Sequence, residues 1–405
     1  MARVPGSGDA ASAVIVGAGI FGASMADALT GRGWNVTLVE RYAPANSRSS
    51  SGDASRLLRF GHGESDGNNE WYTRSAWTAR GLWRSIGEEE HRDLFVNTGA
   101  VWFARRSDGA ETLAEEAMRR VGVPCQRLER GELHDHFPDV RTDDLLFALY
   151  EPQAGLLRAA ESVRVLVERA RRRGARMVCG SATPHADGVR VNEEVLSADQ
   201  VIWACGAWLG RLFPEWAPVT ATRQHVFYWD SPPAWRTGPA WLDNDRHFYG
   251  FPDLDGLGIK ALSDDIGPPL DLDRPLRQPN PAAELDVRRY LAHRFPALSN
   301  VKLLRGQVMH YEITPGRGFL IGPLPGQDRV WIVGGGSGHG FKHGPALGLY
   351  VAAVLEGRQK LDERFAIPEQ RPPREGTQVM AGRSRLDSTG CIGAQDVPQR
   401  PRDPA

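Results

Sequence analysis

The chain has 405 residues, 41% of them hydrophobic, and its 49 lysines and arginines nearly balance its 50 aspartates and glutamates. This length suits two packed domains, and a net charge near zero gives no reason to expect a nucleic-acid or membrane partner. No stretch approaches ~20 consecutive apolar residues, and residues 1–11 lack the apolar core of a signal peptide, so we expect a soluble cytoplasmic protein.

The predicted elements begin with a βαβ unit: a strand over 13–16, a helix over 20–31 and a strand over 35–40. Apolar periodicity then predicts helices over 70–86, 109–121, 159–174, 282–295 and 345–355. Strands are predicted over 96–103, 199–205 and 330–333, among others. Residues 368–405 are rich in Pro, Arg, Gly and Ser, which predicts a disordered tail.

The four cysteines are widely scattered, and neither they nor the histidines have metal-ligand spacing. We therefore expect free thiols and no metal site. The cysteines are Cys125, Cys179, Cys205 and Cys391.

The turn between the first strand and helix has the spacing of a dinucleotide-binding site. Gly17 permits the tight turn, Gly19 lets the backbone approach a pyrophosphate, and Gly22 lets the helix pack on the sheet. Glu40 ends the second strand, where an acid takes ribose hydroxyls and argues against NADP. The cofactor contacts expected here are Gly17, Gly19, Ile20, Phe21, Gly22, Glu40 and Arg41.

This motif alone leaves NAD and FAD open. A second glycine-rich turn between a strand and a helix lies at 334–342, near the far end of the chain. A cofactor held by both ends of a chain is typical of flavoproteins, which favours FAD.

Five stretches make the chain resemble the monomeric sarcosine oxidase and N-methyltryptophan oxidase family of FAD-dependent amine oxidases, within the D-amino-acid oxidase superfamily. The resemblance spans residues 13–366. The stretches are GAGIFG at 17–22, GDASRLLR at 52–59, IWACGAW at 202–208, YGFP with GIK at 249–260, and GGSGHGFK at 335–342.

The resemblance implies an α/β fold in which a discontinuous, Rossmann-like FAD-binding domain carries a second, mixed-sheet substrate domain. We expect the FAD-binding domain over 12–85, 146–218 and 304–367. The substrate domain is expected over 86–145 and 219–303. A monomer is expected, acting on a small amine or amino acid with molecular oxygen.

By the same resemblance, Arg59 and Lys342 bind a substrate carboxylate, Lys260 promotes the reaction with oxygen, and Tyr249 and Tyr311 belong to the active site. An ordinary ion pair of Arg59 with Asp53 or Glu64 is the alternative. Further cofactor contacts are expected at Arg56, Gly206, Met309, Gly336, Gly338, His339, Gly340, Phe341 and Lys342.

The hairpin around residues 253–256 gives an independent argument for the placement of Lys260. A four-residue loop there pairs residue 252 with 257 and places Tyr249 directly opposite Lys260, on one face of the sheet. Trp241 is close enough in sequence to line the same site.

Met309 stands where the family commonly has a cysteine bonded to the flavin. A thioether cannot form that bond, so we expect non-covalent FAD. His310 is a poor substitute, because strand alternation turns it away from the face shared by Met309 and Tyr311. Family histidines are replaced in Ser49–Ser50–Ser51 and by Asp264, which leaves sarcosine itself in doubt as the substrate.

The expected reaction is oxidation of a CH–NH bond to an imine, with hydrogen peroxide as the second product. Two alternatives stay open: a dehydrogenase of the same fold that uses another electron acceptor, and a non-catalytic FAD-binding protein.

Overall fold

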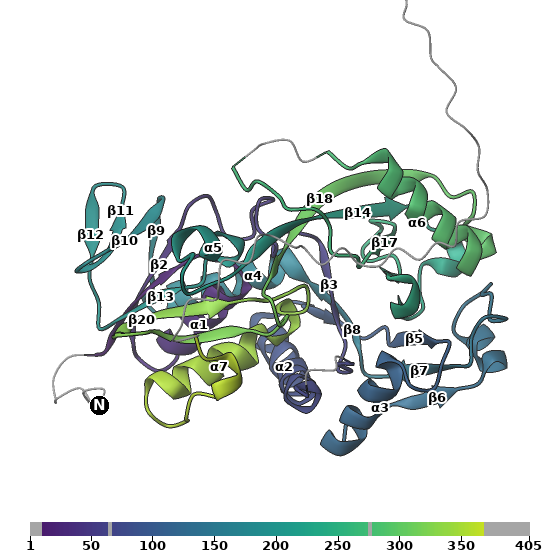
Figure 1. Ribbon diagram of the computed structural model, residues 1–405, viewed down its shortest axis with the longest axis horizontal. Helices are drawn as coiled ribbons and strands as arrows, with labels where there is room; N and C mark the ends of the chain where they lie inside the picture. Colours follow the sequence, from purple (N-terminus) through teal and green to yellow (C-terminus); the bar gives the residue numbers. More distant parts are fainter. Residues whose placement is uncertain (1–9, 64–66, 274–277, 368–405) are drawn as a thin grey trace, which may run out of the picture. The chain divides into compact units, whose positions relative to one another are not determined.

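The described part of the chain starts with the predicted βαβ unit. The computed structural model describes residues 10–63, 67–273 and 278–367. In it β1 (Ser12–Val16) pairs in parallel with β2 (Asn35–Glu40), and α1 (Ile20–Thr30) connects them (Figure 1). The predicted disordered tail, 368–405, lies outside the described residues.

Strands from the beginning, middle and end of the chain form one six-stranded sheet, in the order β19-β20-β13-β1-β2-β9. All neighbours in it are parallel except β19 and β20. After β2 the chain therefore returns to this sheet in three separate segments: β9 beside β2, β13 beside β1, and the pair β19 and β20 beside β13. The further strands are β9 (Arg176–Cys179), β13 (Gln200–Trp203), β19 (Leu320–Leu324) and β20 (Gln327–Gly334).

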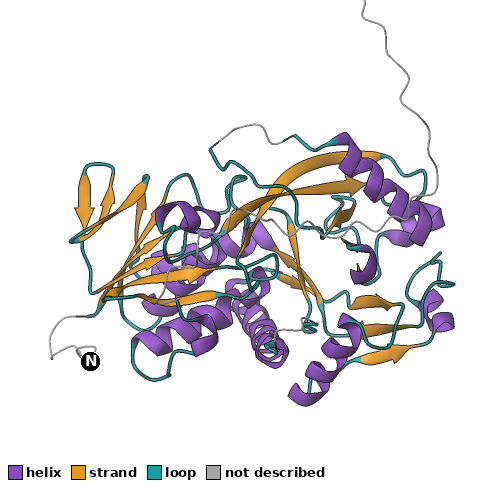
Figure 2. Cartoon of the chain, in the orientation of Figure 1, coloured by secondary structure: helices purple, strands orange, loops and turns teal. Residues whose placement is uncertain are grey.

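A second sheet of eight strands, in the order β18-β14-β17-β16-β15-β5-β7-β6, is mixed: only β15 and β5 pair in parallel. Its long strands β14 and β18 curve beside each other (Figure 2). The strands are β5 (Ala100–Ala104), β6 (Gln126–Leu128), β7 (Phe147–Glu151), β14 (Thr220–Trp229), β15 (Ala240–Asp243), β16 (Phe248–Phe251), β17 (Ile259–Ser263) and β18 (Leu303–Ile313).

Helices cover the sheets and bury separate cores. Helix α1 packs against α4 and α7, and α7 packs against α2 (Figure 1). Helix α6 contributes Val287, Tyr290 and Leu291 to the core on one face of the eight-stranded sheet. The remaining helices are α2 (Asn69–Glu90), α3 (Ala110–Val121), α4 (Ala159–Arg172), α5 (Leu209–Leu212), α6 (Pro281–Arg294) and α7 (Gly344–Leu355).

Two small sheets complete the fold. One is an antiparallel meander of three consecutive strands. The strands of the other lie where the chain passes from one large sheet to the other. Their strands are β10 (Ala182–His185), β11 (Gly188–Val191) and β12 (Glu194–Leu196) in the first, and β3 (Ser55–Leu58), β4 (Phe95–Val96) and β8 (Gly155–Arg158) in the second.

The single strand predicted over 96–103 was wrong. It divides into β4 and β5, which belong to different sheets, and Gly99 between them has φ +75°. This left-handed conformation interrupts a strand and is readily adopted only by glycine.

The predicted domain boundaries remain a prediction, since the described residues up to 367 lie in one contact unit. Strands β7 and β18 were placed with the FAD-binding segments, yet both pair in the eight-stranded sheet.

No helix among the described residues is long and apolar enough to cross a membrane. Within the same residues no group of three or more potential ligands could hold a metal ion, and Cys125, Cys179 and Cys205 are free thiols. Cys391 lies outside the described part.

Candidate active site

Two joined cavities lie beside the predicted site residues. The turn cavity, about 470 Å³, borders the Gly17–Gly22 turn, Glu40 and Gly206. The sheet cavity, about 340 Å³, lies over the eight-stranded sheet and the second glycine-rich turn. Six residues line both and mark their junction: Ile20, Phe21, Ser50, Ser51, His310 and Glu312.

Two glycines of the first turn have no room for a side chain, because neighbouring backbone approaches them closely. Gly17 has φ +103°, and a Cβ there would lie 2.5 Å from the carbonyl oxygen of Ala204. At Gly22 a Cβ would lie 1.8 Å from the carbonyl oxygen of Gly17. Gly22 lines neither cavity. Its missing side chain lets α1 begin directly against the turn, which is the packing role expected of this glycine.

Glu40 lies at the end of β2 and faces the turn cavity beside Arg41. Its carboxylate accepts hydrogen bonds from the backbone N–H groups of Ala18 (2.9 Å) and Tyr42 (3.0 Å). These two bonds fix the acid relative to the glycine turn. Its position is the one from which an acid binds ribose hydroxyls in dinucleotide folds.

The second glycine-rich turn borders the sheet cavity. Gly335 and Gly338 have φ values of +74° and +85°, which an L side chain rarely adopts. The turn leads through a short 3-10 helix into α7. All the predicted contacts of this segment line the cavity: Gly336, Gly338, His339, Gly340, Phe341 and Lys342.

Lys260 is buried in the wall of the sheet cavity, with only 3% of its surface exposed. Its Nζ atom donates to Oδ2 of Asp53 at 2.5 Å and to the carbonyl oxygen of Ser55 at 3.0 Å. Burial lowers the pKa of Lys260 to about 8, although the Asp53 carboxylate raises it. At neutral pH the lysine is therefore a fixed cation.

Asp53 is the centre of a larger polar cluster. Besides Lys260, it accepts hydrogen bonds from Arg56 (2.9 Å), Tyr228 (2.7 Å) and Gln307 (2.6 Å). Burial raises its pKa, but Lys260 and Arg56 outweigh burial and hold the carboxyl ionised. Sequence reasoning named Asp53 only as an alternative partner for Arg59 and missed this role.

The predicted register of the hairpin was wrong by two residues. Tyr249 pairs with Leu262, and Phe251 pairs with Lys260. The strand ends before Pro252, which has no N–H to donate, and the longer loop that follows is closed by a hydrogen bond from Gly258 N to the Asp253 side chain (3.0 Å). A shift of two residues preserves the face, so Tyr249 and Lys260 both still line the sheet cavity.

The two tyrosines form a directed chain of hydrogen bonds. The hydroxyl oxygens of Tyr249 and Tyr311 are 2.9 Å apart, and Tyr311 donates to Oδ1 of Asp264 at 3.2 Å. An ionised carboxylate only accepts, so with Asp264 ionised Tyr311 donates to it and accepts from Tyr249, whose oxygen keeps its own lone pairs as acceptors. Burial raises the pKa of both tyrosines, so each stays protonated at neutral pH.

Arg59 and Lys342 also line the sheet cavity. The Arg59 guanidinium stacks on Trp102, with Cζ 4.6 Å from the ring centroid, and donates to the carbonyl oxygen of Gly61. Burial first, and then the charge of Arg59, lower the pKa of Lys342 well below its ordinary value. The alternative was an ion pair of Arg59 with Asp53 or Glu64. Asp53 forms ion pairs with Arg56 and Lys260, and Glu64 lies outside the described residues.

Glu151, on β7, positions the segment that carries Arg59. It is fully buried and accepts hydrogen bonds from Phe60 N (2.6 Å), Gly61 N (3.2 Å) and Trp102 Nε1 (2.7 Å). No sequence signal marked this residue, because its partners come from two segments that lie far from it in the chain.

Met309 and Tyr311 line the sheet cavity from β18, as the alternation predicted. His310 also borders both cavities, and its ring packs edge-on against Trp208, with centroids 5.8 Å apart. The expectation that Trp241 lines the site was wrong. Its ring lies beneath Gly250, where a Cβ would be 2.1 Å from Trp241 Cζ2, and it is buried in the core with Phe295.

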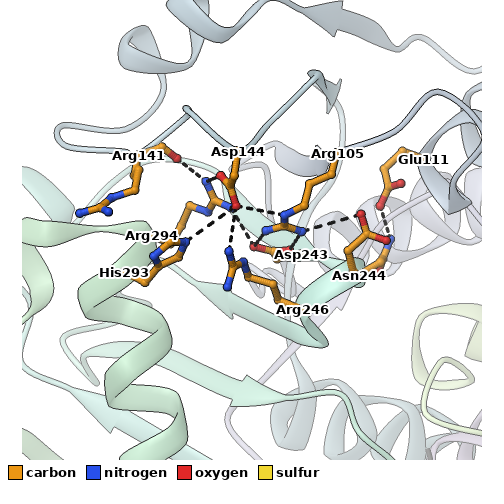
Figure 3. Close-up of polar contacts among 10 residues, drawn as sticks. Arg105, Glu111, Arg141, Asp144, Asp243, Asn244, Arg246, His293 and Arg294 are labelled. Carbon is orange, nitrogen blue, oxygen red and sulfur yellow. Dashed lines mark hydrogen bonds and ion pairs between the residues drawn. The ribbon is translucent and has the colours of Figure 1, made fainter. Parts of the chain in front are cut away.

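A network of ion pairs, drawn in Figure 3, includes Asp243, which also lines the sheet cavity. Asp243 is fully buried and accepts from Arg105 at 2.7 and 3.1 Å and from Arg294 at 3.3 Å. Asp144 accepts from the same two arginines. The network joins the ends of β15 and α6 to Arg105, the residue that follows β5. Asp243 and its neighbour Asn244 line the sheet cavity.

A glycine turn follows a parallel strand, an acid ends the next strand, and a second sheet carries the buried cation Lys260 and two tyrosines. Together these features define a dinucleotide-dependent oxidoreductase. The model of the family described as FAD dependent oxidoreductase matches residues 12–354. The chain belongs to this family and is an FAD-dependent enzyme.

Two curated proteins with similar sequences support this family assignment. The chain is 27% identical over 370 residues to monomeric sarcosine oxidase of Bacillus sp. (strain B-0618), covering 86% of this chain and 93% of that protein. It is 26% identical over 363 residues to N-methyl-L-tryptophan oxidase of Salmonella newport (strain SL254), covering 85% and 94%.

Solved structures show the same fold. L-proline dehydrogenase from P. horikoshii superposes with a TM-score of 0.76 at 22% identity, covering 87% of this chain and 95% of that one. Iminodiacetate oxidase from Chelativorans sp. BNC1 superposes with a TM-score of 0.74 at 20% identity, covering 88% and 98%.

The cavities suit FAD. The turn cavity has the side-chain-free cradle at Gly17 and the anchored acid Glu40 that an adenosine diphosphate half requires. Its continuation into the sheet cavity leaves space for the rest of the cofactor beside Arg56, Lys260 and Lys342.

Proposed function

We propose that this protein oxidises the CH–NH bond of an amino acid or of a secondary or cyclic amine and transfers the electrons to oxygen. This proposal rests on one observation: five predicted site residues from four separate segments line the sheet cavity, which adjoins the turn cavity. They are Arg59, Tyr249, Lys260, Tyr311 and Lys342. The names of the two curated relatives support an amine substrate.

Bound FAD supplies the two-electron acceptor. Arg59 and Lys342 hold the substrate carboxylate. The planar guanidinium offers paired donors to its two oxygens, and the bound carboxylate favours the protonated form of Lys342 by opposing the effects of burial and Arg59. The Tyr249 oxygen, kept as an acceptor by the chain to Asp264, takes a hydrogen bond from the substrate nitrogen.

The overall reaction removes two electrons and two protons from the CH–NH group and leaves an imine. Oxygen takes up the same two electrons and two protons as hydrogen peroxide. Lys260 promotes that step, since a buried cation at a fixed position stabilises the negative charge that forms on oxygen.

We propose that FAD is held without a covalent bond. Met309 lines the sheet cavity with a thioether, whose sulfur has no free valence for such a bond. Acid precipitation of the purified protein tests this: the yellow colour is expected in the supernatant, and colour that stays with the pellet would refute it.

A peroxide-coupled screen of N-methyl, cyclic and ordinary L- and D-amino acids tests the reaction. At least one amine is expected to produce stoichiometric peroxide in air and to bleach the flavin under nitrogen. Bleaching with dye reduction but without peroxide in air would establish a dehydrogenase instead. A flavin that no amine reduces would favour a non-catalytic FAD-binding role.

A further inference from the structure

Glu312 lies on β18 where the turn cavity and the sheet cavity meet, and it lines both. Residues two apart on a strand share a face, so Glu312 points to the side of His310 and away from Met309 and Tyr311. None of the expectations drawn from the sequence concerned this residue.

The two carboxyl oxygens of Glu312 have different surroundings. Oε1 accepts a hydrogen bond from the backbone N–H of Gly336 at 2.9 Å. Oε2 is buried without a hydrogen-bond partner among the described residues. A Cβ built on Gly206 would lie 3.4 Å from Oε2, so this oxygen faces the turn that follows β13 and borders the turn cavity.

An unsatisfied oxygen at this depth requires an explanation, because buried polar atoms in proteins almost always have partners. Burial raises the pKa of Glu312 to about 7, while the N–H groups of Gly336 and Gly335 oppose that rise. Glu40, Arg41, Cys205, Arg211, Asp273 and His310 line the turn cavity with Glu312, and Arg56, Arg317 and Lys342 line the sheet cavity. None of these groups contributes to the pKa shift of Glu312, which comes from burial and the two N–H groups alone. Burial also raises the pKa of the Cys205 thiol.

We propose that Glu312 is a cofactor-binding residue whose Oε2 atom forms a hydrogen bond with the hydroxyl chain that joins the two halves of FAD. A hydroxyl suits this oxygen in both protonation states, since it donates to a carboxylate and accepts from a carboxylic acid. A phosphate would bring a second anion to a buried carboxyl. The assignment concerns FAD binding and holds whichever amine the enzyme oxidises.

Affinity measurements on the full-length apoprotein test the assignment. FAD is titrated against wild type, Glu312→Leu and Glu312→Gln, and the dissociation constant is read from flavin fluorescence. Glu312→Leu is expected to weaken FAD binding at least tenfold. Glu312→Gln keeps an oxygen for Gly336 and an N–H₂ donor for the hydroxyl, and is expected to bind within about threefold of wild type. The exposed residue Glu194 on β12 supplies the control, Glu194→Gln, with unchanged affinity.

ADP, which lacks the hydroxyl chain, separates this role from a merely structural one. The three proteins are expected to bind ADP equally within about twofold. Equal losses for ADP and FAD in Glu312→Leu would overturn the proposal, as would unchanged FAD affinity.

The pH dependence keeps the proposal testable should Glu312→Leu fail to fold. Wild type is expected to bind FAD more weakly at pH 8.5 than at pH 6, because the ionised carboxyl then lies near the anionic cofactor. Glu312→Gln is expected to lose most of this difference. An identical pH dependence in both proteins would contradict the assignment.

Discussion

The Nζ atom of Lys260 lies 2.5 Å from Oδ2 of Asp53, and 207 residues separate the two in sequence. The pair joins β17 of the eight-stranded sheet to the loop before β3. Removing the lysine therefore tests its role in the oxygen reaction and its ion pair together.

In Lys260→Met we expect the reaction of the reduced enzyme with oxygen to slow by about 10²–10³-fold, the usual effect of removing one preorganised charge. Anaerobic reduction by the amine is expected to change less than about fivefold. Stopped-flow absorbance measures the two half-reactions separately. Equal slowing of both would contradict a specific role with oxygen.

The pKa of Lys260, lowered to about 8, predicts how the wild-type oxygen reaction depends on pH. The cation is present below that value and is lost above it, so the rate is expected to decline between about pH 8 and pH 10. The same titration in Lys260→Met is expected to be flat over this range.

Asp53→Asn is expected to destabilise the protein by about 3–5 kcal/mol, because it leaves the buried Lys260 and the half-buried Arg56 without their counter-charge. Urea unfolding monitored by tryptophan fluorescence measures this. The matched control is Asp286→Asn on α6, whose ion pair with Arg289 is exposed and is expected to contribute less than about 1 kcal/mol. A loss below 1 kcal/mol in Asp53→Asn would show that the pair is not closed in solution.

Tyr311→Phe is expected to raise KM for the amine about fivefold with a smaller effect on kcat. Without the Tyr311 hydroxyl, the Tyr249 proton loses its partner and the Tyr249 oxygen is no longer held as an acceptor. One hydrogen bond contributes about 1 kcal/mol, which sets this magnitude. Steady-state kinetics with the best amine from the screen give both constants, and an unchanged KM would remove the tyrosine chain from substrate binding.

Asp243→Asn tests the network in Figure 3. Arg105 and Arg294 then share a neutral partner in a buried site, and we expect a loss of about 3–5 kcal/mol in the free energy of unfolding. Glu284→Gln, which breaks the half-buried pair with Arg288 one helical turn away, is expected to cost less than about 1 kcal/mol. Similar losses in both variants would contradict a special contribution from burial.

Local patterns predicted a large part of this molecule. The βαβ unit, the glycine turn beside Glu40 and the glycine-rich turn at 334–342 all follow from strand, turn and helix signals within about 30 residues, and the structure has each of them. The face shared by Met309 and Tyr311 also follows from local geometry, since side chains alternate along any strand.

Local patterns did not predict the register between β16 and β17. It depends on where Pro252 ends the first strand and on how the Asp253 side chain closes the loop. A shift of two residues moves every cross-strand partner but keeps each side chain on its face. For this reason Lys260 was placed on the correct face opposite the wrong residue.

By itself the sequence determined a dinucleotide cradle, its acid and the residue types available for amine chemistry, because each depends on backbone conformation and short-range spacing. Only the tertiary structure decided which charges meet. Asp53 binds Lys260, Glu151 holds the Arg59 segment, and Glu312 lies at the junction of the cavities. Those contacts join segments far apart in the chain, and their strength comes from burial that only the packed sheets provide.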